Sequence, residues 1–158
     1  MGTLSKGLGS YGGFAACSSQ LRELLINRAR SFIYTTALPP AVIAASLGAL
    51  EVLHKNVSLG EQLRERALLF REKLRSAGLD TINSQSQIIP IKIGESAKAL
   101  ALAERLRQTG ILASAIRPPT VPQGGARLRL SVTLAHTTQD LEYAADIISA
   151  AAKDERIL

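Results

Sequence analysis

The chain has 158 residues, of which 46% are hydrophobic and 20% are charged. This composition is typical of a folded globular protein and excludes an intrinsically disordered chain. The length allows one core, or one domain with part of another. No apolar run approaches the length of a membrane span, and the first residues lack the order of a secretory signal. We therefore expect a cytoplasmic protein with no membrane partner.

The net charge of +6 raises the question of a nucleic-acid partner. Aromatic residues make up only 4% of the chain, Trp is absent, and basic residues are interspersed with acidic ones. This pattern is typical of a solvated basic surface, or of a weak attraction for an anionic acyl carrier, and no nucleic-acid partner is predicted. The single cysteine, Cys17, excludes an internal disulfide framework, and we expect it to be a small buried side chain. His54 and His136 lack a partner cluster at metal-ligand spacing, so no metal site is predicted.

A glycine-rich stretch at Gly2–Gly13, with the sequence GTLSKGLGSYGG, opens the chain. Its one lysine, Lys6, stands near the hydroxyls of Thr3 and Ser5, and glycines let the backbone approach a bound group closely. A nucleotide phosphate loop is excluded, because no Ser or Thr follows the lysine. The stretch also matches the G-x-G-x-x-G fingerprint of dinucleotide-binding loops. This interpretation is disfavoured, because no strand precedes the match and no helix start follows it. A lysine that forms a Schiff base with pyridoxal phosphate (PLP), and a surface loop with a solvated lysine, both remain open.

Five further elements are predicted in the first half from the spacing of apolar residues. In chain order they are a strand at 14–17, a helix capped by Ser18 or Ser19, an extended segment at 31–38, a helix at 41–53, and a helix with the stripe Leu63, Ala67, Phe70 and Leu74. The helix at 41–53 is apolar on nearly every face, so we expect it to be buried, in part against another subunit.

The second half is predicted to form a small α+β unit. In chain order its elements are a strand at 88–93, a helix at 97–108, an extended segment at 111–116, a stiff proline loop at 117–122, an alternating strand at 127–133, and a last helix capped by Thr137 with Asp140. Arg127 and Arg129 share the polar face of the alternating strand. Their spacing alone favours solvent-facing side chains, although a strand also holds the arginine fork rigidly enough to bind a carboxylate.

Several blocks of the chain resemble one enzyme family. Gly2–Gly13 resembles the cofactor-lysine segment of the α-oxoamine synthases, which are fold-type I PLP enzymes. Asn27–Pro40, Arg117–Pro122, Ala126–Ser131 and Ala135–Thr137 are similar to later blocks of that family, in the same order, and are most like its 8-amino-7-oxononanoate synthases. The resemblance therefore spans the chain almost from end to end.

The resemblance implies an α/β and α+β fold. Residues 1–86 would be the trailing part of the PLP-binding large domain with long connecting helices, and residues 87–158 the small carboxy-terminal α+β domain. In this family Lys6 would be the catalytic residue that carries PLP, and Thr3 and Ser5 would lie near the cofactor phosphate. Thr36 would reach the cofactor phosphate of the partner subunit in a homodimer.

The resemblance also implies a substrate and a reaction. Arg129 would bind the carboxylate of L-alanine, and Arg117 would lie close to the substrate. Lys6 would act as the base in a decarboxylating condensation of L-alanine with pimeloyl-CoA or a pimeloyl carrier protein. The product would be 8-amino-7-oxononanoate, an intermediate of biotin biosynthesis.

The resemblance covers only the carboxy-terminal part of such an enzyme. Five residues precede Lys6, whereas the family carries the aspartate that pairs with the pyridine nitrogen, and a ring that stacks on the cofactor, before its lysine. We therefore expect the isolated chain to have little or no synthase activity. Two alternatives remain, namely another α-oxoamine synthase such as 2-amino-3-ketobutyrate ligase, and a non-catalytic interaction or structural fragment.

Overall fold

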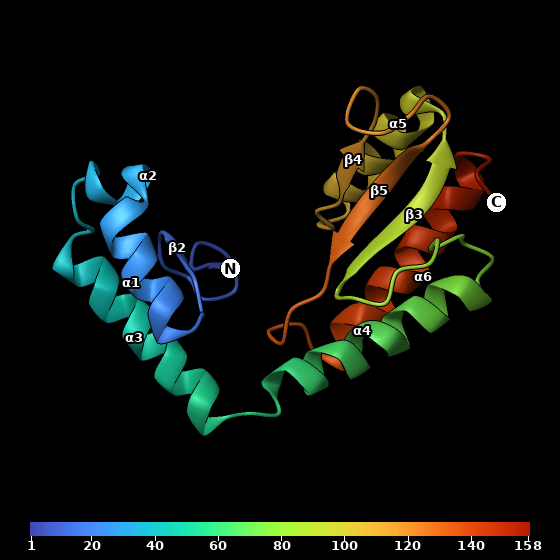
Figure 1. Ribbon diagram of the computed structural model, residues 1–158. Helices are drawn as coiled ribbons and strands as arrows, with labels where there is room; N and C mark the ends of the chain where they lie inside the picture. Colours follow the sequence, from blue (N-terminus) through green and yellow to red (C-terminus); the bar gives the residue numbers. More distant parts are fainter. The chain divides into compact units, whose positions relative to one another are not determined.

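The computed structural model describes residues 1–158 and divides them into two units, Met1–Val57 and Ser58–Leu158 (Figure 1). The first unit holds β1 (Gly2–Thr3), β2 (Gly13–Phe14), α1 (Ser19–Arg28), α2 (Arg30–Ile33) and α3 (Pro40–Lys55). The second holds α4 (Leu59–Ser76), β3 (Ile88–Gly94), α5 (Ser96–Gln108), β4 (Ser114–Ile116), β5 (Ala126–Ser131) and α6 (Thr138–Asp154).

The first unit begins with a two-stranded antiparallel hairpin, in which Gly2 pairs with Phe14 and Thr3 with Gly13. The predicted strand at 14–17 is therefore present only at its first residue. Helix α1 begins as expected after Ser18, whose side chain accepts a hydrogen bond from the backbone of Leu21. Helix α3 begins at Pro40, because proline tolerates the first helical turn, where its missing N–H has no partner to lose.

Two expectations for the first unit are wrong, and a third, the burial of α3, is not met within the chain. The segment predicted to be extended at 31–38 begins inside α2, and after this helix the side-chain hydroxyl of Thr35 donates to the carbonyl of Ser31 at 2.7 Å. Cys17 is exposed. Helix α3 is not buried either, since Ser46 is its one buried residue and large apolar side chains remain in solvent. Those of α3 that are exposed are Ile43, Leu47, Leu50, Val52 and Leu53.

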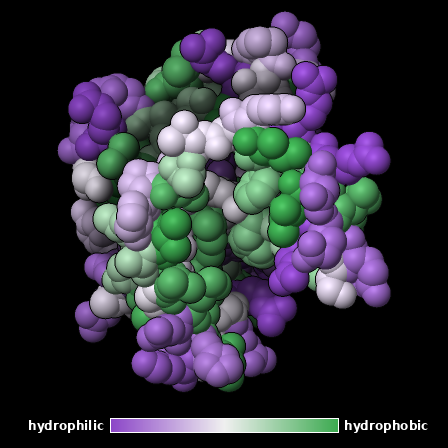
Figure 2. Space-filling view, turned by 60° about the vertical axis from the view of Figure 1, so that its left-hand side comes forward, coloured by the Kyte–Doolittle hydropathy of each residue, from purple (hydrophilic) through white to green (hydrophobic).

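Exposed large apolar side chains are concentrated in the first unit, although the second unit also has some. The short elements of the first unit are too few to cover α3, and the only buried residues that the first unit contains are Leu4 and Ser46. Broad hydrophobic areas reach the surface in the space-filling view (Figure 2). Apolar surface of this extent marks a place where other protein packs.

The second unit is built on a three-stranded antiparallel sheet of order β3-β5-β4. Leu128 lies opposite Ile91 on one side and opposite Ala115 on the other, so β5 is the central strand. Because side chains alternate along a strand, Leu128 and Leu130 face the core while Arg127 and Arg129 face away from it. The predicted alternation of this strand is confirmed.

The core of the second unit lies between the sheet and helices α4, α5 and α6. Seven large apolar side chains in it are fully buried, and each contributes about 1.5–3 kcal/mol relative to its exposed state. They are Leu74, Ile89, Ile91, Leu102, Leu106, Leu128 and Ile148. The predicted stripe of α4 is buried at Ala67, Phe70 and Leu74, and the predicted capping box joins Thr137 with Asp140 at the start of α6.

The two units separate between Val57 and Ser58. Helix α4 belongs to the second unit, because it packs on α6 and β3 and so shares the core of the sheet unit. No single helix is long and apolar enough to cross a membrane, and only α3 and α4 taken together as a broken pair reach that length and composition.

Candidate cofactor and substrate site

The β1–β2 hairpin holds Lys6 in a tight turn. The backbone of Gly9 donates to the carbonyl of Lys6 at 2.8 Å, and Ser10 donates to the carbonyl of Leu4 at 3.0 Å. Leu4 in turn donates to the carbonyl of Gly12 at 2.9 Å. The side chain of Lys6 is exposed and forms no ion pair, so its amine is free to react.

Thr3 and Ser5 lie side by side before this turn. The Thr3 hydroxyl is 3.4 Å from that of Ser5, and the backbone of Ser5 donates to Thr3 Oγ1 at 3.2 Å. Both hydroxyls also approach the carbonyl of Gly12 at 3.4 Å, which is long for a hydroxyl hydrogen bond. Two hydroxyl groups with only long hydrogen bonds therefore lie next to an unpaired lysine. Such an arrangement can bind a ligand that carries an anionic group.

Ser10 and Ser46 anchor this hairpin on α3. The Ser10 hydroxyl donates to the carbonyl of Val42 at 3.0 Å, and its oxygen lies 2.8 Å from that of Ser46. The motif analysis did not single out either serine. Ser46 stands among apolar residues of α3, which is a sequence signal that it has a polar partner. That signal does not indicate which segment Ser46 contacts.

Thr36 lies in the same unit, in the segment between α2 and α3. It is exposed and makes no hydrogen bond with the hairpin. The segment does approach the hairpin at Leu38, whose Cδ1 lies 3.0 Å from where a Cβ on Gly12 would stand. The structure therefore brings Thr3, Ser5 and Lys6 together, while Thr36 stands apart from that group.

The hairpin fits part of what PLP requires. It supplies an amine for covalent attachment and two hydroxyl donors for a phosphate. An added Cβ on Gly7 or Gly9 would meet nothing within 4 Å, so the backbone beyond Lys6 leaves open space. The first acidic residue of the chain is Glu23, and hence the hairpin itself supplies no carboxylate for the pyridine nitrogen.

Arg117 and Arg129 belong to the second unit. Arg129 lies opposite Pro90 and Ser114 on the sheet face that points away from the core, and it is exposed. Arg117 directly follows β4 and is also exposed. Neither guanidinium forms an ion pair or a hydrogen bond within the chain, so both can bind an external carboxylate.

Arg127 differs from Arg129 although the two share one face. Its Nε donates to the carbonyl of Gly125 at 2.9 Å, and its side chain is half-buried. Arg129 is thus the arginine of this strand with all of its donors free. This difference agrees with the choice of Arg129 as the carboxylate ligand, although it does not test that role.

Comparison with known proteins identifies the family. The sequence pattern of the family described as aminotransferase class I and II matches residues 1–148. This chain belongs to that family. The 8-amino-7-oxononanoate synthase of Citrifermentans bemidjiense is 46% identical over 155 residues, which cover 97% of this chain and 40% of that protein.

Solved structures of this aminotransferase family have the same fold. The crystal structure of 8-amino-7-oxononanoate synthase from Francisella tularensis superposes with a TM-score of 0.81 at 30% identity, and covers 98% of this chain and 45% of that chain. A structure of SPT with its PLP internal aldimine superposes with a TM-score of 0.92 at 26% identity, and covers 99% of this chain and 40% of that chain. The expected resemblance, fold class and PLP dependence of the family are confirmed.

This chain spans about 40% of the length of the curated relative from Citrifermentans bemidjiense. The matched part holds both the lysine hairpin and the arginine-bearing sheet. The expectation that the resemblance covers only part of such an enzyme is therefore confirmed.

Proposed function

We propose that this chain forms the carboxy-terminal part of an 8-amino-7-oxononanoate synthase, a cytoplasmic PLP-dependent acyltransferase of biotin biosynthesis. The reaction condenses L-alanine with a pimeloyl thioester, carried by CoA or by a carrier protein, and releases the free thiol of that carrier and carbon dioxide. The observation that carries the proposal is the hairpin that presents a free Lys6 beside two hydroxyls. The 46% identity to a synthase of that name supports the choice of reaction.

Lys6 has two roles in this proposal. Its exposed amine would hold the cofactor covalently. The same amine would act as the base that takes the proton from the alanine Cα. PLP, when bound, acts as an electron sink for the electron pair left on that carbon.

The remaining site residues bind and orient. Thr3 and Ser5 donate their hydroxyl hydrogens to the cofactor phosphate, and Thr36 does so across a homodimer interface. Arg129 binds the alanine carboxylate through its free guanidinium fork, which sets the direction of the bond that breaks. Arg117 lies close to the substrate, where a cation attracts the acyl donor.

The isolated chain is proposed to be inactive. It spans about 40% of the relative, and the hairpin supplies no carboxylate for the pyridine nitrogen, which the electron sink needs. Fragment complementation tests this directly. The remainder of the Citrifermentans bemidjiense synthase, supplied as a second polypeptide, should restore formation of 8-amino-7-oxononanoate from alanine and pimeloyl-CoA, measured by mass spectrometry.

The same assay separates the alternatives. Product from glycine and acetyl-CoA, with none from alanine and pimeloyl-CoA, would indicate a 2-amino-3-ketobutyrate ligase. No product from either pair, alone or with the second polypeptide, would indicate a non-catalytic fragment and overturn the proposal.

Attachment of the cofactor is tested without activity. PLP is added to the chain, borohydride traps any Schiff base, and peptide mapping locates the adduct. We expect the adduct on Lys6 and its loss in Lys6→Ala, while Lys153→Ala, which removes an exposed lysine without an ion pair, keeps it. Label spread evenly over the surface lysines would contradict the assignment of Lys6.

A further inference from the structure

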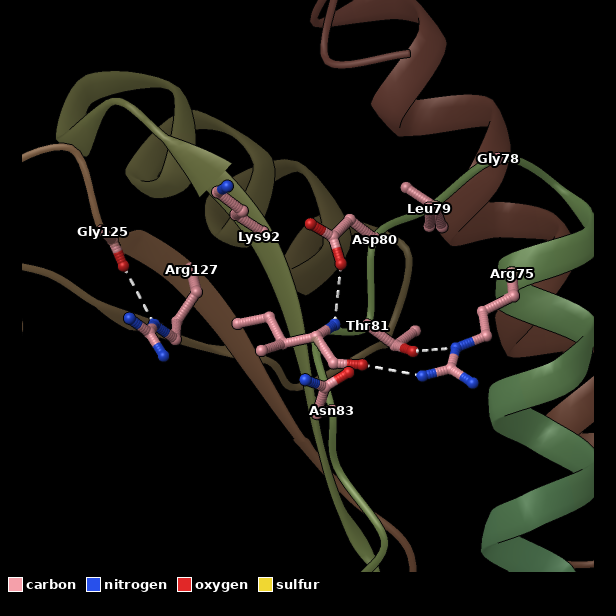
Figure 3. Close-up of a pocket in the computed structure, with 10 residues that line it drawn as sticks. Arg75, Gly78, Leu79, Asp80, Thr81, Asn83, Lys92, Gly125 and Arg127 are labelled. Carbon is pink, nitrogen blue, oxygen red and sulfur yellow. Dashed lines mark hydrogen bonds between the residues drawn. The ribbon is translucent and has the colours of Figure 1, made fainter.

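A second cationic site lies in the sheet unit, apart from the residues assigned above. An open cavity of about 710 Å³ is bordered by the end of α4, the loop that follows it, and the adjacent strands β3 and β5. Figure 3 shows its lining residues, among them three cationic side chains, Arg75 on α4, Lys92 on β3 and Arg127 on β5. The fold therefore gathers positive charge from residues that are far apart in sequence.

None of these three cations is neutralised by an ion pair. Every ion pair in the chain involves other residues, and Lys92 makes no side-chain hydrogen bond. Arg127 uses only its Nε, toward the carbonyl of Gly125, and so keeps its terminal nitrogens free. The terminal amine and the outer guanidinium nitrogens can therefore bind a ligand.

Two hydrogen bonds within the chain hold the Arg75 side chain in place. Its Nε donates to the hydroxyl of Thr81 at 2.6 Å and one terminal nitrogen donates to the carbonyl of Ile82 at 2.7 Å. Thr81 is only 1% exposed, so this anchor is rigid. The second terminal nitrogen has no partner within the chain.

One acid, Asp80, also lines the cavity. Its Oδ1 accepts a hydrogen bond from the backbone of Ile82 at 2.8 Å, and it forms no ion pair with any of the three cations. Three cations and one anion leave a local charge of two positive units. A phosphate monoester, which carries nearly two negative charges at pH 7, matches this charge better than a single carboxylate.

We propose that this cavity binds a phosphate monoester through Lys92 and Arg127, with Arg75 contributing at its edge. The argument uses the second unit alone and does not depend on the proposed reaction. Two sources can supply the group, the 3′-phosphate of CoA and free inorganic phosphate. Arginine and lysine donors suit both, because they bind the shared phosphate oxygens.

Calorimetric titration of the full chain with CoA, dephospho-CoA and inorganic phosphate tests the proposal. We expect binding that weakens with added salt and falls by about tenfold or more in the Lys92→Ala/Arg127→Ala double variant. Lys153→Ala, which removes an exposed cation outside the cavity, should keep the original affinity. CoA binding more tightly than dephospho-CoA identifies the nucleotide monoester as the source, and equal affinity of phosphate and CoA identifies free phosphate.

Because Arg127 also holds the carbonyl of Gly125, a second variant keeps the test independent of folding. Lys92→Glu alters only an exposed side chain and reverses its charge, so it should abolish binding without changing the unfolding transition. Unchanged affinity in both variants, or no binding of CoA or phosphate by the unaltered chain at low salt, would overturn the proposal.

Discussion

The hydroxyl oxygens of Ser10 and Ser46 lie 2.8 Å apart, and through this contact α3 holds the hairpin that carries Lys6. Replacing Ser46 with alanine removes the hydroxyl without adding atoms to the buried position, so the hairpin should loosen. A lost hydrogen bond of this kind is worth about 1 kcal/mol, which is roughly a fivefold change in local opening. Amide hydrogen exchange at Leu4 and Ser10 measures it. Ser19→Ala, at the exposed start of α1, is the control, and unchanged exchange in Ser46→Ala would contradict the anchoring role.

Gly12 is predicted to resist substitution where Gly7 does not. Gly12 has φ of 101°, which disfavours an L side chain, and an added Cβ would lie 3.0 Å from Leu38. Gly12→Ala should therefore destabilise the hairpin by about 1 kcal/mol or more. Gly7 has no positive φ and no neighbour within 4 Å, so Gly7→Ala is the matched control. Equal hydrogen-exchange protection in both variants would show that the hairpin does not require glycine at position 12.

The centre of the sheet determines the stability of the second unit. Leu128 is 0% exposed and lies on the central strand, so Leu128→Ala should lower the free energy of unfolding by about 2–5 kcal/mol. Urea unfolding measures the loss. Leu100, which is 47% exposed on α5, gives a control in which the same truncation should change stability by less than about 0.5 kcal/mol.

The start of α6 should weaken at low pH. The side-chain hydrogen bond from Thr137 to the Asp140 carboxylate, together with one from the Thr137 backbone, lowers the pKa of Asp140. A carboxyl whose pKa is lower in the folded state stabilises the fold above its unfolded pKa of about 3.9, and this contribution disappears as pH falls through the folded pKa. The unfolding midpoint should thus decline below about pH 4 less steeply in Asp140→Asn than in the unaltered chain. Identical pH profiles would exclude this contribution.

The exposed apolar side chains of α3 should make the chain self-associate. Leu47 is 58% exposed and Leu50 is 46% exposed, and both would gain from burial against a second protein surface. Sedimentation should show species larger than a monomer, and the double change Leu47→Lys with Leu50→Lys should shift them toward the monomer. A clean monomer of the unaltered chain would contradict this expectation.

Local signals were sufficient for most elements of the second unit. The apolar stripe of α4, the alternation of β5 and the capping box of α6 each depend on neighbours within one or two turns, and the structure has all three. The segment at 31–38 was misjudged because Phe32, Ile33 and Tyr34 favour strands, whereas α2 is helical there. Burial of α3 could not be judged either, since it depends on what packs against the helix.

For the candidate site, the sequence predicts which residues carry the chemistry but not how the fold holds them. Lys6 and its two hydroxyl neighbours follow from residue types within a few positions of one another. The anchor from Ser10 to Ser46 joins residues 36 apart, and the cavity with Arg75, Lys92 and Arg127 joins three elements. Contacts of this range depend on the tertiary fold, about which a periodic pattern carries no information.

The order of strands in the sheet has a consequence for synthesis of the chain. The strands β3 and β4 do not pair with each other, and each finds its only partner in β5, which is made after both. While the ribosome is still adding residues before Ala126, neither ladder can form. The sheet must therefore assemble only after β5 is made, and a polypeptide released before β5 is complete leaves both earlier strands open to aggregation.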